Sequence, residues 1–384
     1  MTSRRSLLQT MAILPVINAC SSTNSASSAS SINFTPSGLP LRRVKISDSR
    51  VIRTVSGLRP FRREGFVVKG QRIGDKTVVH NYGHGGGGIT LSWGTSHLAM
   101  EIAQQTAHKK CAVLGCGVMG LTSARLLQDQ GWDVTIYAKA LPPHTTSNIA
   151  GGQWSPASVY EDASLTPQFQ RQFEEAMTLS YRYFQNLVGP KYGVRWISNY
   201  QLSSEPRPTN DLPHNYSGMY PQLSILGPGE HPFPLPFATH YDTMLIEPAI
   251  FLKRLMDDFY GAGGEINVRE FQDFDEVLTL EEPVIINCTG LGARELFDDK
   301  LLFPIKGQLS FVLPQEEIDY ITITDGSAGT YMFPRSDGIL LGGTFEYNNW
   351  DLTPDPAETR RIIDQQSAFF EAMKDPWSRG KFSF

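Results

Sequence analysis

The chain has few cysteines and no large excess of charge of one sign. Four cysteines in 384 residues are too few for a disulfide framework, and none stands in a CxxC or Cys/His spacing typical of zinc sites. The 34 basic and 39 acidic residues leave a net charge of −5 and are spread along the chain, so nothing resembles a surface for a nucleic-acid backbone. These absences argue against nucleic acid as a partner and leave metal chemistry without support.

Apolar residues, glycine and proline are plentiful instead. Hydrophobic residues make up 40% of the chain, which also has 34 glycines and 25 prolines. The composition excludes a disordered chain, collagen and a coiled coil, and the length suffices for one large core or two ordinary ones. A mixed α/β protein with many tight turns is expected.

The N-terminus has the order of features found in an export signal. Arg4 and Arg5 precede an apolar stretch, residues 7–17, that is too short to span a bilayer, and Cys20 follows. The arginine pair resembles the twin-arginine motif, and Cys20 resembles the lipidated cysteine of a lipoprotein. We expect a signal over residues 1–20, a disordered tether over 21–40, and an exported, periplasmic protein held to the envelope by a lipid on Cys20.

A glycine turn in the first third predicts a dinucleotide site. An apolar strand leads into Gly115, Gly117 and Gly120, an amphipathic helix follows, and Gly131 closes that helix before a second strand. These glycines permit a tight turn, close approach to a pyrophosphate and close helix packing, while the helix N-terminus faces the phosphates. The second strand ends on Lys139 instead of the acid that usually binds the ribose. Backbone groups and Lys139 are expected to take its place.

A second glycine cluster, Gly83–Gly88, has five glycines in six positions. Such a loop can lay successive backbone N–H groups against a flat or anionic ligand, and by itself it could equally be a flexible lid. With the residues before it, the loop closely resembles the HNYGHGG signature of the D-amino-acid oxidase family of flavoproteins, in which it contacts FAD and substrate.

Several other segments resemble the same family. They are GLRPFR from Gly57, TTSNIAGGQWSP from Thr145, INCTGLGA from Ile286, IKGQ from Ile305, YMFPR from Tyr331, and GGT from Gly342. The match spans roughly residues 41–374. It implies an α/β fold in which an FAD-binding Rossmann-type domain carries a second, substrate domain built on a mostly antiparallel sheet.

The order of these motifs is unusual. In the family the GLRP and HNYGHGG segments are C-terminal, whereas here they precede the GxGxxG turn, so the chain looks circularly permuted. We expect an FAD-binding part over residues 41–160, a substrate domain over 161–346 with a returning FAD-binding strand near 284–293, and a C-terminal helix and tail over 347–384.

The resemblance implies four residues of the catalytic site. Arg59 would hold a substrate carboxylate through its planar fork, against the simpler reading of a surface salt bridge. Tyr241 would cover the carboxylate, although a tyrosine on a strand more often serves packing. Arg335 would lie near the substrate mouth or form a structural ion pair, and Gly86 belongs to the glycine loop.

The resemblance also implies that FAD is the cofactor and indicates which residues contact it. No metal site is expected. His80 and His84 are expected to be structural or flavin-adjacent, not general bases. The expected FAD contacts are Gly83, His84, Gly85, Gly88, Ile89, Thr90, Gly115, Gly117, Val118, Met119, Gly120, Ala138, Lys139, Thr145, Thr146, Ser147, Gly151, Gly152, Gln153, Trp154, Thr289 and Gly290.

The implied reaction is oxidation of a D-amino acid by FAD, giving a 2-oxo acid and ammonia, with dioxygen reoxidising the flavin to yield hydrogen peroxide. Three alternatives stay open. They are an oxidase of glycine, sarcosine or another small amine, a membrane-linked D-amino acid dehydrogenase, and a degenerate flavin-fold protein that only binds an amino acid.

Overall fold

The computed structural model describes residues 41–207, 217–325 and 329–374. The expected signal and tether therefore lie outside the described residues, as does the end of the tail. Within the described part, no helix combines the length and apolar character needed to cross a membrane.

The first of two sheets is the mostly parallel one expected of a dinucleotide-binding domain. Its strands run in the order β2-β3-β10-β4-β5-β9, and only β2 is antiparallel to its neighbour. The central strands β3, β10 and β4 are mostly buried and have apolar middles, as expected where helices cover both faces of a sheet. Their bounds are β2 Val67–Ile73, β3 Lys76–Tyr82, β4 Lys110–Leu114, β5 Asp133–Ala138, β9 Glu265–Val268 and β10 Val284–Asn287.

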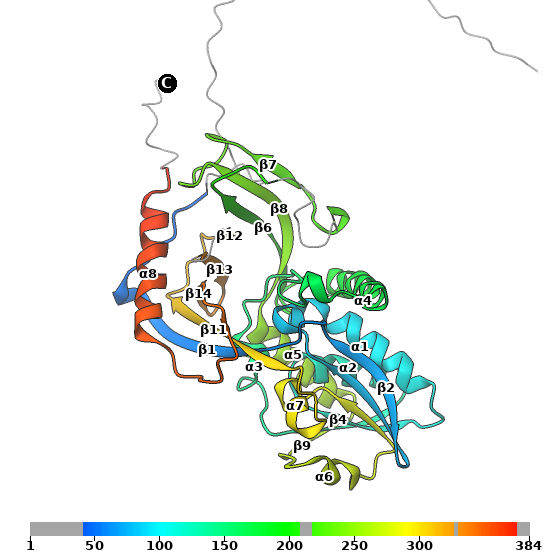
Figure 1. Cartoon of the computed structure of the whole chain (residues 1–384). Helices are drawn as coiled ribbons and strands as arrows, with labels where there is room; N and C mark the ends of the chain where they lie inside the picture. The colour runs from blue at the N-terminus through cyan, green and yellow to red at the C-terminus, as the bar shows by residue number, and fades with distance from the viewer. Residues whose placement is uncertain (1–40, 208–216, 326–328, 375–384) are drawn as a thin grey trace, which may run out of the picture. The chain divides into compact units, whose positions relative to one another are not determined.

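Helices of very different size cover the two faces of this sheet (Figure 1). The large core on one face unites the sheet with α1 (Gly88–Gln104), α2 (Val118–Asp129), α4 (Pro167–Asn186) and α5 (Pro248–Gly261). A smaller core on the other face contains α6 (Phe274–Leu278) and residues next to α7 (Ala293–Leu296). The carboxyl ends of β3, β10 and β4 meet at one edge, where the glycine motifs follow the strands.

The second sheet is antiparallel except for the β12–β6 pair. Its order is β1-β11-β14-β13-β12-β6-β8-β7, with the short β15 also paired to β11. The bounds are β1 Val51–Phe61, β6 Val194–Ser203, β7 Ser224–Leu226, β8 Phe237–Ile246, β11 Phe303–Val312, β12 Tyr320–Thr324, β13 Tyr331–Arg335, β14 Gly338–Gly342 and β15 Glu346–Tyr347. The expected fold class, a Rossmann-type domain with a mostly antiparallel second domain, is confirmed.

The boundary between the two domains differs from the expected one. β1, which was expected in the FAD-binding part, pairs with β11 and belongs to the antiparallel sheet. In the other direction, the returning strand expected near residues 284–293 is β10, which pairs in the parallel sheet, and β9 joins that sheet as well from within residues 161–346. Each domain is therefore assembled from separated stretches of chain, because strand pairing follows spatial neighbours and not sequence order.

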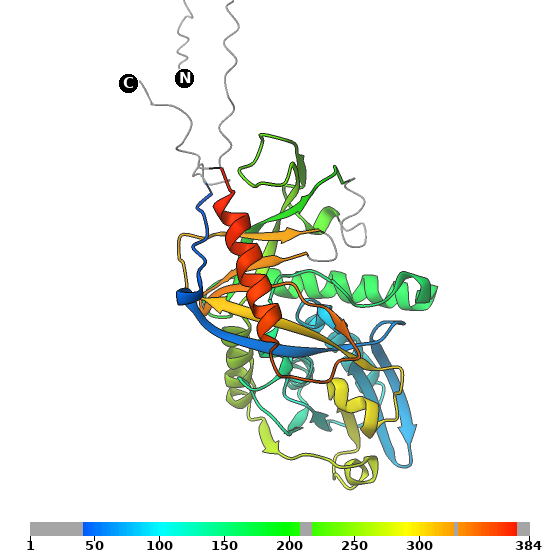
Figure 2. The ribbon, with the colours of Figure 1, turned by 60° about the vertical axis from the view of Figure 1, so that its left-hand side comes forward.

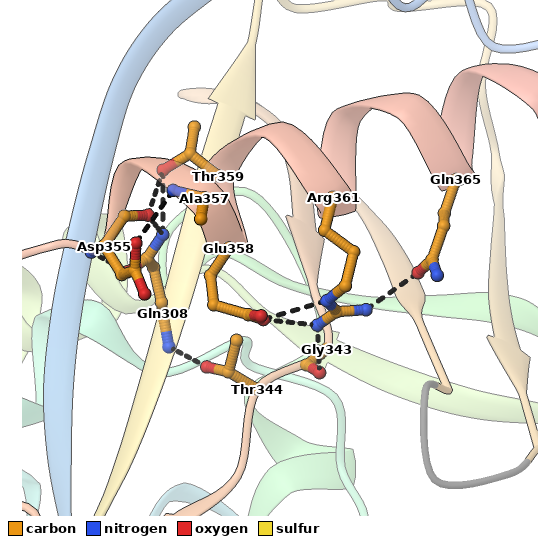
Figure 3. A network of polar contacts seen from close by, with 9 residues as sticks. All are labelled: Gln308, Gly343, Thr344, Asp355, Ala357, Glu358, Thr359, Arg361 and Gln365. Atoms are coloured by element: carbon orange, nitrogen blue, oxygen red, sulfur yellow. Dashed lines mark hydrogen bonds and ion pairs between the residues drawn. The ribbon is translucent and has the colours of Figure 1, made fainter.

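Helix α8 (Pro356–Glu371) covers the outer face of the antiparallel sheet (Figure 2). Asp355 caps the helix by accepting the Ala357 N–H at 2.8 Å. The buried Gln308 side chain of β11 donates to the Asp355 carbonyl at 2.9 Å and to Thr359 Oγ1 at 2.8 Å, and accepts the Asp355 N–H at 2.6 Å. Arg361 reaches the Gly343 carbonyl at 3.0 Å one turn later (Figure 3). The sheet thus fixes where this helix begins.

Replacing Gln308 by alanine should lower the free energy of unfolding by about 2–4 kcal/mol. The change removes three hydrogen bonds of the buried Gln308 side chain, with the Asp355 N–H, the Asp355 carbonyl and Thr359 Oγ1, and each contributes roughly 0.5–1.5 kcal/mol. Urea denaturation of the purified protein measures the loss. Gln365→Ala is the matched control, because this exposed side chain bonds only Arg361; equal stability of the two variants would contradict the role of Gln308.

The start of the described chain runs along α8 in the opposite direction. Arg43 Nη2 donates to the Met373 carbonyl at 2.5 Å, Ser367 Oγ donates to the Ile46 carbonyl at 3.4 Å, and Arg360 pairs with Asp48 at 2.5 Å. Residues 41–48 and the end of α8 are therefore neighbours, as Figure 2 also shows.

Candidate functional site

The GxGxxG turn closes as tightly as the sequence predicts. Gly115 has φ +104°, and a Cβ there would lie 2.5 Å from the Cys288 carbonyl oxygen. A Cβ on Gly120 would lie 1.9 Å from the Gly115 carbonyl oxygen. Only glycine fits either position, and the turn delivers the chain into the N-terminus of α2 at Val118. This open cradle at a helix N-terminus suits a pyrophosphate.

Two other segments complete this cradle. Ser147 Oγ accepts the Val118 N–H at 3.0 Å and would lie 3.1 Å from a Cβ on Gly117. The returning turn after β10 is held by Asn287, whose Oδ1 accepts the N–H and the hydroxyl of Thr289 at 3.2 and 2.7 Å. Gly290 follows with φ +57°. The structure thus brings Ser147 beside Gly117 and Thr289 beside Gly115, and the contact of these segments with FAD stays a prediction.

The glycine loop after β3 meets the first turn of α2. A Cβ on Gly88 would lie 3.8 Å from the terminal methyl of Met119, and α1 begins at Gly88 just as α2 begins at Val118. Thr90 donates its hydroxyl to the Ser155 carbonyl at 2.7 Å, and Ile89 is buried beside it. Two helix N-termini therefore converge on one place.

The glycine loop is clamped and does not resemble a free lid. Gly85 has φ +54°, and a Cβ there would lie 2.0 Å from the Ser158 carbonyl oxygen. Gly86 donates its N–H to that same carbonyl at 3.0 Å, so this amide proton is not available to a ligand. Gly85 also packs against Phe61 at the end of β1, with the nearest ring carbon 2.9 Å from the ideal Cβ. The loop therefore borders the face of β1 that carries Arg59.

Both histidines beside the loop are uncharged at neutral pH. Burial lowers the pKa of His84 to about 3 and that of His80 to about 4. His84 Nε2 lies 3.1 Å from Thr95 Oγ1, and His80 Nδ1 accepts the Asn287 amide N–H at 3.1 Å. These are structural contacts of weak bases, which agrees with the expectation that neither histidine is a general base.

The segment after β5 connects the two sheets. Gly152 has φ +93°, and its carbonyl accepts the Ile246 N–H at 2.7 Å. The Trp154 N–H donates to the Met244 carbonyl at 2.7 Å, and Gln153 donates to Asn199 at 3.0 Å. The preceding short helix α3 (Thr146–Ile149) lies against β1. Residues 145–154 thus run from the cofactor cradle to the antiparallel sheet.

Lys139 is engaged at the surface. Its Nζ lies 3.2 Å from Glu270 Oε1, and both side chains are more than half exposed. The Ala138 carbonyl accepts the Arg269 N–H at 3.1 Å. A contact from Lys139 to the cofactor ribose stays a prediction.

Three glycines leave space on one face of the antiparallel sheet around Arg59. A Cβ on Gly307 would lie 2.6 Å from both terminal nitrogens of Arg59, and one on Gly342 would lie 2.2 Å from the Tyr331 ring. A Cβ on Gly57 would lie 2.9 Å from the Ile149 side chain. The side chains of Arg59, Tyr331 and Ile149 therefore lie directly on the backbone at these three glycines. Larger side chains at the glycine positions would leave no room for them.

The Arg59 guanidinium has an unused edge. Its Nη2 reaches the Tyr331 hydroxyl at 3.5 Å, while Nη1 is buried without a hydrogen-bond partner, and no carboxylate of the described chain pairs with it. A partly buried arginine whose Nη1 is buried and lacks an anion is costly, and its planar fork matches a carboxylate. The arrangement can bind a carboxylate between Arg59 and Tyr331.

Tyr331 is a site residue that the sequence interpretation missed. Tyr331 stands in the YMFPR segment, whereas the family resemblance implies Tyr241 as the residue that covers the carboxylate. The structure places Tyr241 elsewhere: the side chain is 2% exposed and packs against Tyr220, with ring centroids 4.8 Å apart. Burial raises the pKa of Tyr241, and its hydroxyl bonds Gln153. These are the contacts of a packing residue, and a contact of Tyr241 with the substrate carboxylate stays a prediction.

Arg335 links Asp337 to the Ala150 backbone. Its guanidinium donates to both oxygens of Asp337 at 2.8 Å and to the Ala150 carbonyl at 2.7 Å, and the side chain is 2% exposed. These contacts occupy the fork, so the ion-pair alternative describes Arg335 better than a place at the substrate mouth. The short spacing of Arg335 and Asp337 was the signal for this pair.

The site shows neither a reactive thiol nor a metal-binding group among the described residues. Cys116 in the glycine turn is buried, and burial raises the pKa of its thiol to about 12. Among the described residues, no group of three histidines, cysteines or acids is placed to hold a metal ion.

The comparisons with known proteins agree on one family. A family model described as FAD dependent oxidoreductase, or DAO, matches residues 110–381. The D-amino-acid oxidase of Rubrobacter xylanophilus is 31% identical over 265 residues, which cover 67% of this chain and 76% of that protein. Human D-aspartate oxidase is 29% identical over 261 residues, which cover 67% and 74%.

A likeness to solved structures supports the same fold. Glycine oxidase from Geobacillus kaustophilus superposes with a TM-score of 0.53 at 17% identity, covering 69% of this chain and 80% of that one. The family is FAD-dependent, and the glycine cradle at the N-terminus of α2 is shaped for that dinucleotide. The chain is an enzyme of the DAO family of FAD-dependent oxidoreductases.

Proposed function

We propose that this enzyme oxidises D-amino acids with FAD and dioxygen. One molecule each of D-amino acid, water and dioxygen would give the 2-oxo acid, ammonia and hydrogen peroxide. The observation that carries the proposal is the unused edge of Arg59, which lies next to Tyr331 on the face of β1 that the glycine loop borders through Phe61. The names of the relatives in Rubrobacter and in man support a D-amino acid as the substrate.

One set of residues would hold FAD, and another would orient the substrate. Gly115, Gly117, Gly120 and Ser147 would hold the pyrophosphate, and the Gly85–Gly88 loop would border the flavin. FAD, when bound, supplies the acceptor for the hydride that leaves the α-carbon. Arg59 and Tyr331 would fix the substrate carboxylate and thereby direct the α-C–H, which is catalysis by orientation. No charged base is required, in keeping with the neutral His80 and His84.

Anaerobic absorbance of the purified, FAD-loaded protein tests this function. D-amino acids should bleach the flavin band, L-isomers should not, and admitting air should restore the colour with release of peroxide. Bleaching by D-isomers without recovery in air would favour a dehydrogenase with another acceptor. Bleaching only by glycine or sarcosine would favour the small-amine oxidase, and a flavoprotein that no amine bleaches would leave amino-acid binding alone.

We also propose that the chain is a circular permutant of its family. The motif order supports this, and so do the contacts between residues 41–48 and the end of α8, because those stretches would be joined in the unpermuted order. A rearranged chain that starts at Lys110, continues from residue 384 into residue 41 and ends at Lys109 should fold and bind FAD. Failure of this chain to bind FAD would count against the permutation.

Export to the periplasm and lipid attachment at Cys20 are likewise proposed. The order of the arginine pair, the apolar stretch and the cysteine in the sequence supports them. Mass spectrometry of the mature N-terminus decides the matter, since processing would leave a lipid-modified Cys20 as the first residue.

A further inference from the structure

The Arg59 side chain touches one more residue that no motif singled out. Phe345 follows the GGT segment, and the Arg59 Cζ lies 5.4 Å from the centroid of its ring. This is within the range of a cation–π contact, in which the ring face attracts the guanidinium. Phe345 is therefore part of the immediate surroundings of the unused arginine edge.

Strand pairing fixes Phe345 at this position. β15 pairs with β11 so that Lys306 faces Glu346 and Ile305 faces Tyr347, and continuing this register by one residue places Phe345 across from Gly307. The Gln308 N–H anchors the chain just before it, through a 2.5 Å bond to Thr344 Oγ1. The Arg59 side chain thus extends from β1 over Gly307 of β11 toward Phe345, which lies on the other side of β11.

Phe345 stays partly open to solvent and has an aromatic neighbour. It is 45% exposed and has Tyr347 as a ring neighbour, with centroids 5.2 Å apart. Tyr347 in turn lies 6.3 Å from Phe61, the residue against which Gly85 packs. These rings form a wall that runs from the glycine loop to the guanidinium and shields part of it from water.

We propose that Phe345 is a positioning residue for the carboxylate-binding arginine. Its ring, together with Gly307, keeps the guanidinium flat so that the free edge with Nη1 faces the incoming carboxylate. Shielding from water strengthens the ion pair formed there, because the local dielectric constant falls. The proposal rests on the proposed function in that it assumes that a carboxylate occupies Arg59, but it does not depend on the substrate being oxidised.

The test compares three variants of the FAD-loaded protein. Phe345→Leu removes the ring face and should raise the calorimetric Kd for butyrate, a carboxylate that lacks an oxidisable amine, by about tenfold. The KM for the best amino acid should rise by a similar factor while kcat changes less than threefold. Phe345→Tyr keeps the ring and should restore wild-type values. Trp350→Leu, a 51% exposed aromatic of the same loop, is the matched control and should behave like wild type.

The outcomes separate this proposal from the function itself. A wild-type Kd for butyrate in Phe345→Leu would overturn it, and so would a loss of thermal stability or bound FAD with the butyrate Kd unchanged, since that marks a purely structural role. If the wild-type protein binds butyrate but oxidises no amino acid, the proposed function fails and the Kd still decides the role of Phe345. If it binds no carboxylate at all, both proposals fall.

Discussion

Arg59→Ala should lower kcat/KM for the amino acid substrate by about 10²–10⁴-fold while bound FAD stays at the wild-type level. Each charge-assisted hydrogen bond to a carboxylate contributes roughly 1.5–3 kcal/mol, and the variant loses two of them. The cofactor should stay because Arg59 lies on β1 of the antiparallel sheet, whereas the glycine cradle is built from α2 and the segments around it. Steady-state kinetics with a flavin absorbance spectrum measures both quantities.

Two further variants sharpen this result. Arg59→Lys keeps the charge but not the planar fork, so it should recover only part of the lost activity. Arg63→Ala is the matched control, because Arg63 is half exposed and forms an ion pair with Glu161 at 2.5 Å. An Arg59→Ala enzyme with wild-type kcat/KM would remove the basis of the proposed function.

Gly120→Ala should yield a protein that purifies with less than about a tenth of the wild-type FAD. The new Cβ would lie 1.9 Å from the Gly115 carbonyl oxygen, and the obstacle is backbone, which cannot swing aside. The turn must therefore open or α2 must shift, and either change distorts the cradle for the pyrophosphate. The flavin-to-protein absorbance ratio after purification and dialysis with excess FAD measures the loss.

Gly261→Ala provides the comparison for this variant. Gly261 is also a helical glycine, at the end of α5, but a Cβ there meets nothing within 4 Å. It should bind FAD like wild type and gain slight stability from the better helix former. Full FAD content in Gly120→Ala would show that the close approach is not needed for binding.

The GxGxxG turn of the cofactor site could be predicted from the sequence because most of its constraints are local. Gly115 and Gly120 are required by the turn in which they stand, through a positive φ and a contact five residues away. A strand, a glycine turn and a helix follow one another without interruption. Nothing distant is needed to predict such a unit.

The substrate half depends on which strands become neighbours, and the sequence does not contain that information locally. Tyr241 and Tyr331 both stand on strands with apolar surroundings, and alternation shows only which residues share a face. The structure separates them because β13 lies two strands from β11, with Gly342 of β14 making room for the Tyr331 ring. Tyr241 lies on β8, beyond β12 and β6. For the same reason the sheet to which β1 belongs could not be predicted.

The pairing of β1 with β11 has a consequence for the order in which the molecule assembles during synthesis. Val51 pairs with Val312 and Phe61 with Phe303, so the strand that carries Arg59 leaves the ribosome early and has no partner until the last third of the chain emerges. The parallel sheet has the same dependence, because β3 pairs with β10. Closing such long loops is slow, since the entropy of the intervening chain is lost before the contacts form. A chain truncated before β10 would thus lack the partner strand of the Arg59 strand and the centre of the cofactor sheet, and we expect it not to take up flavin.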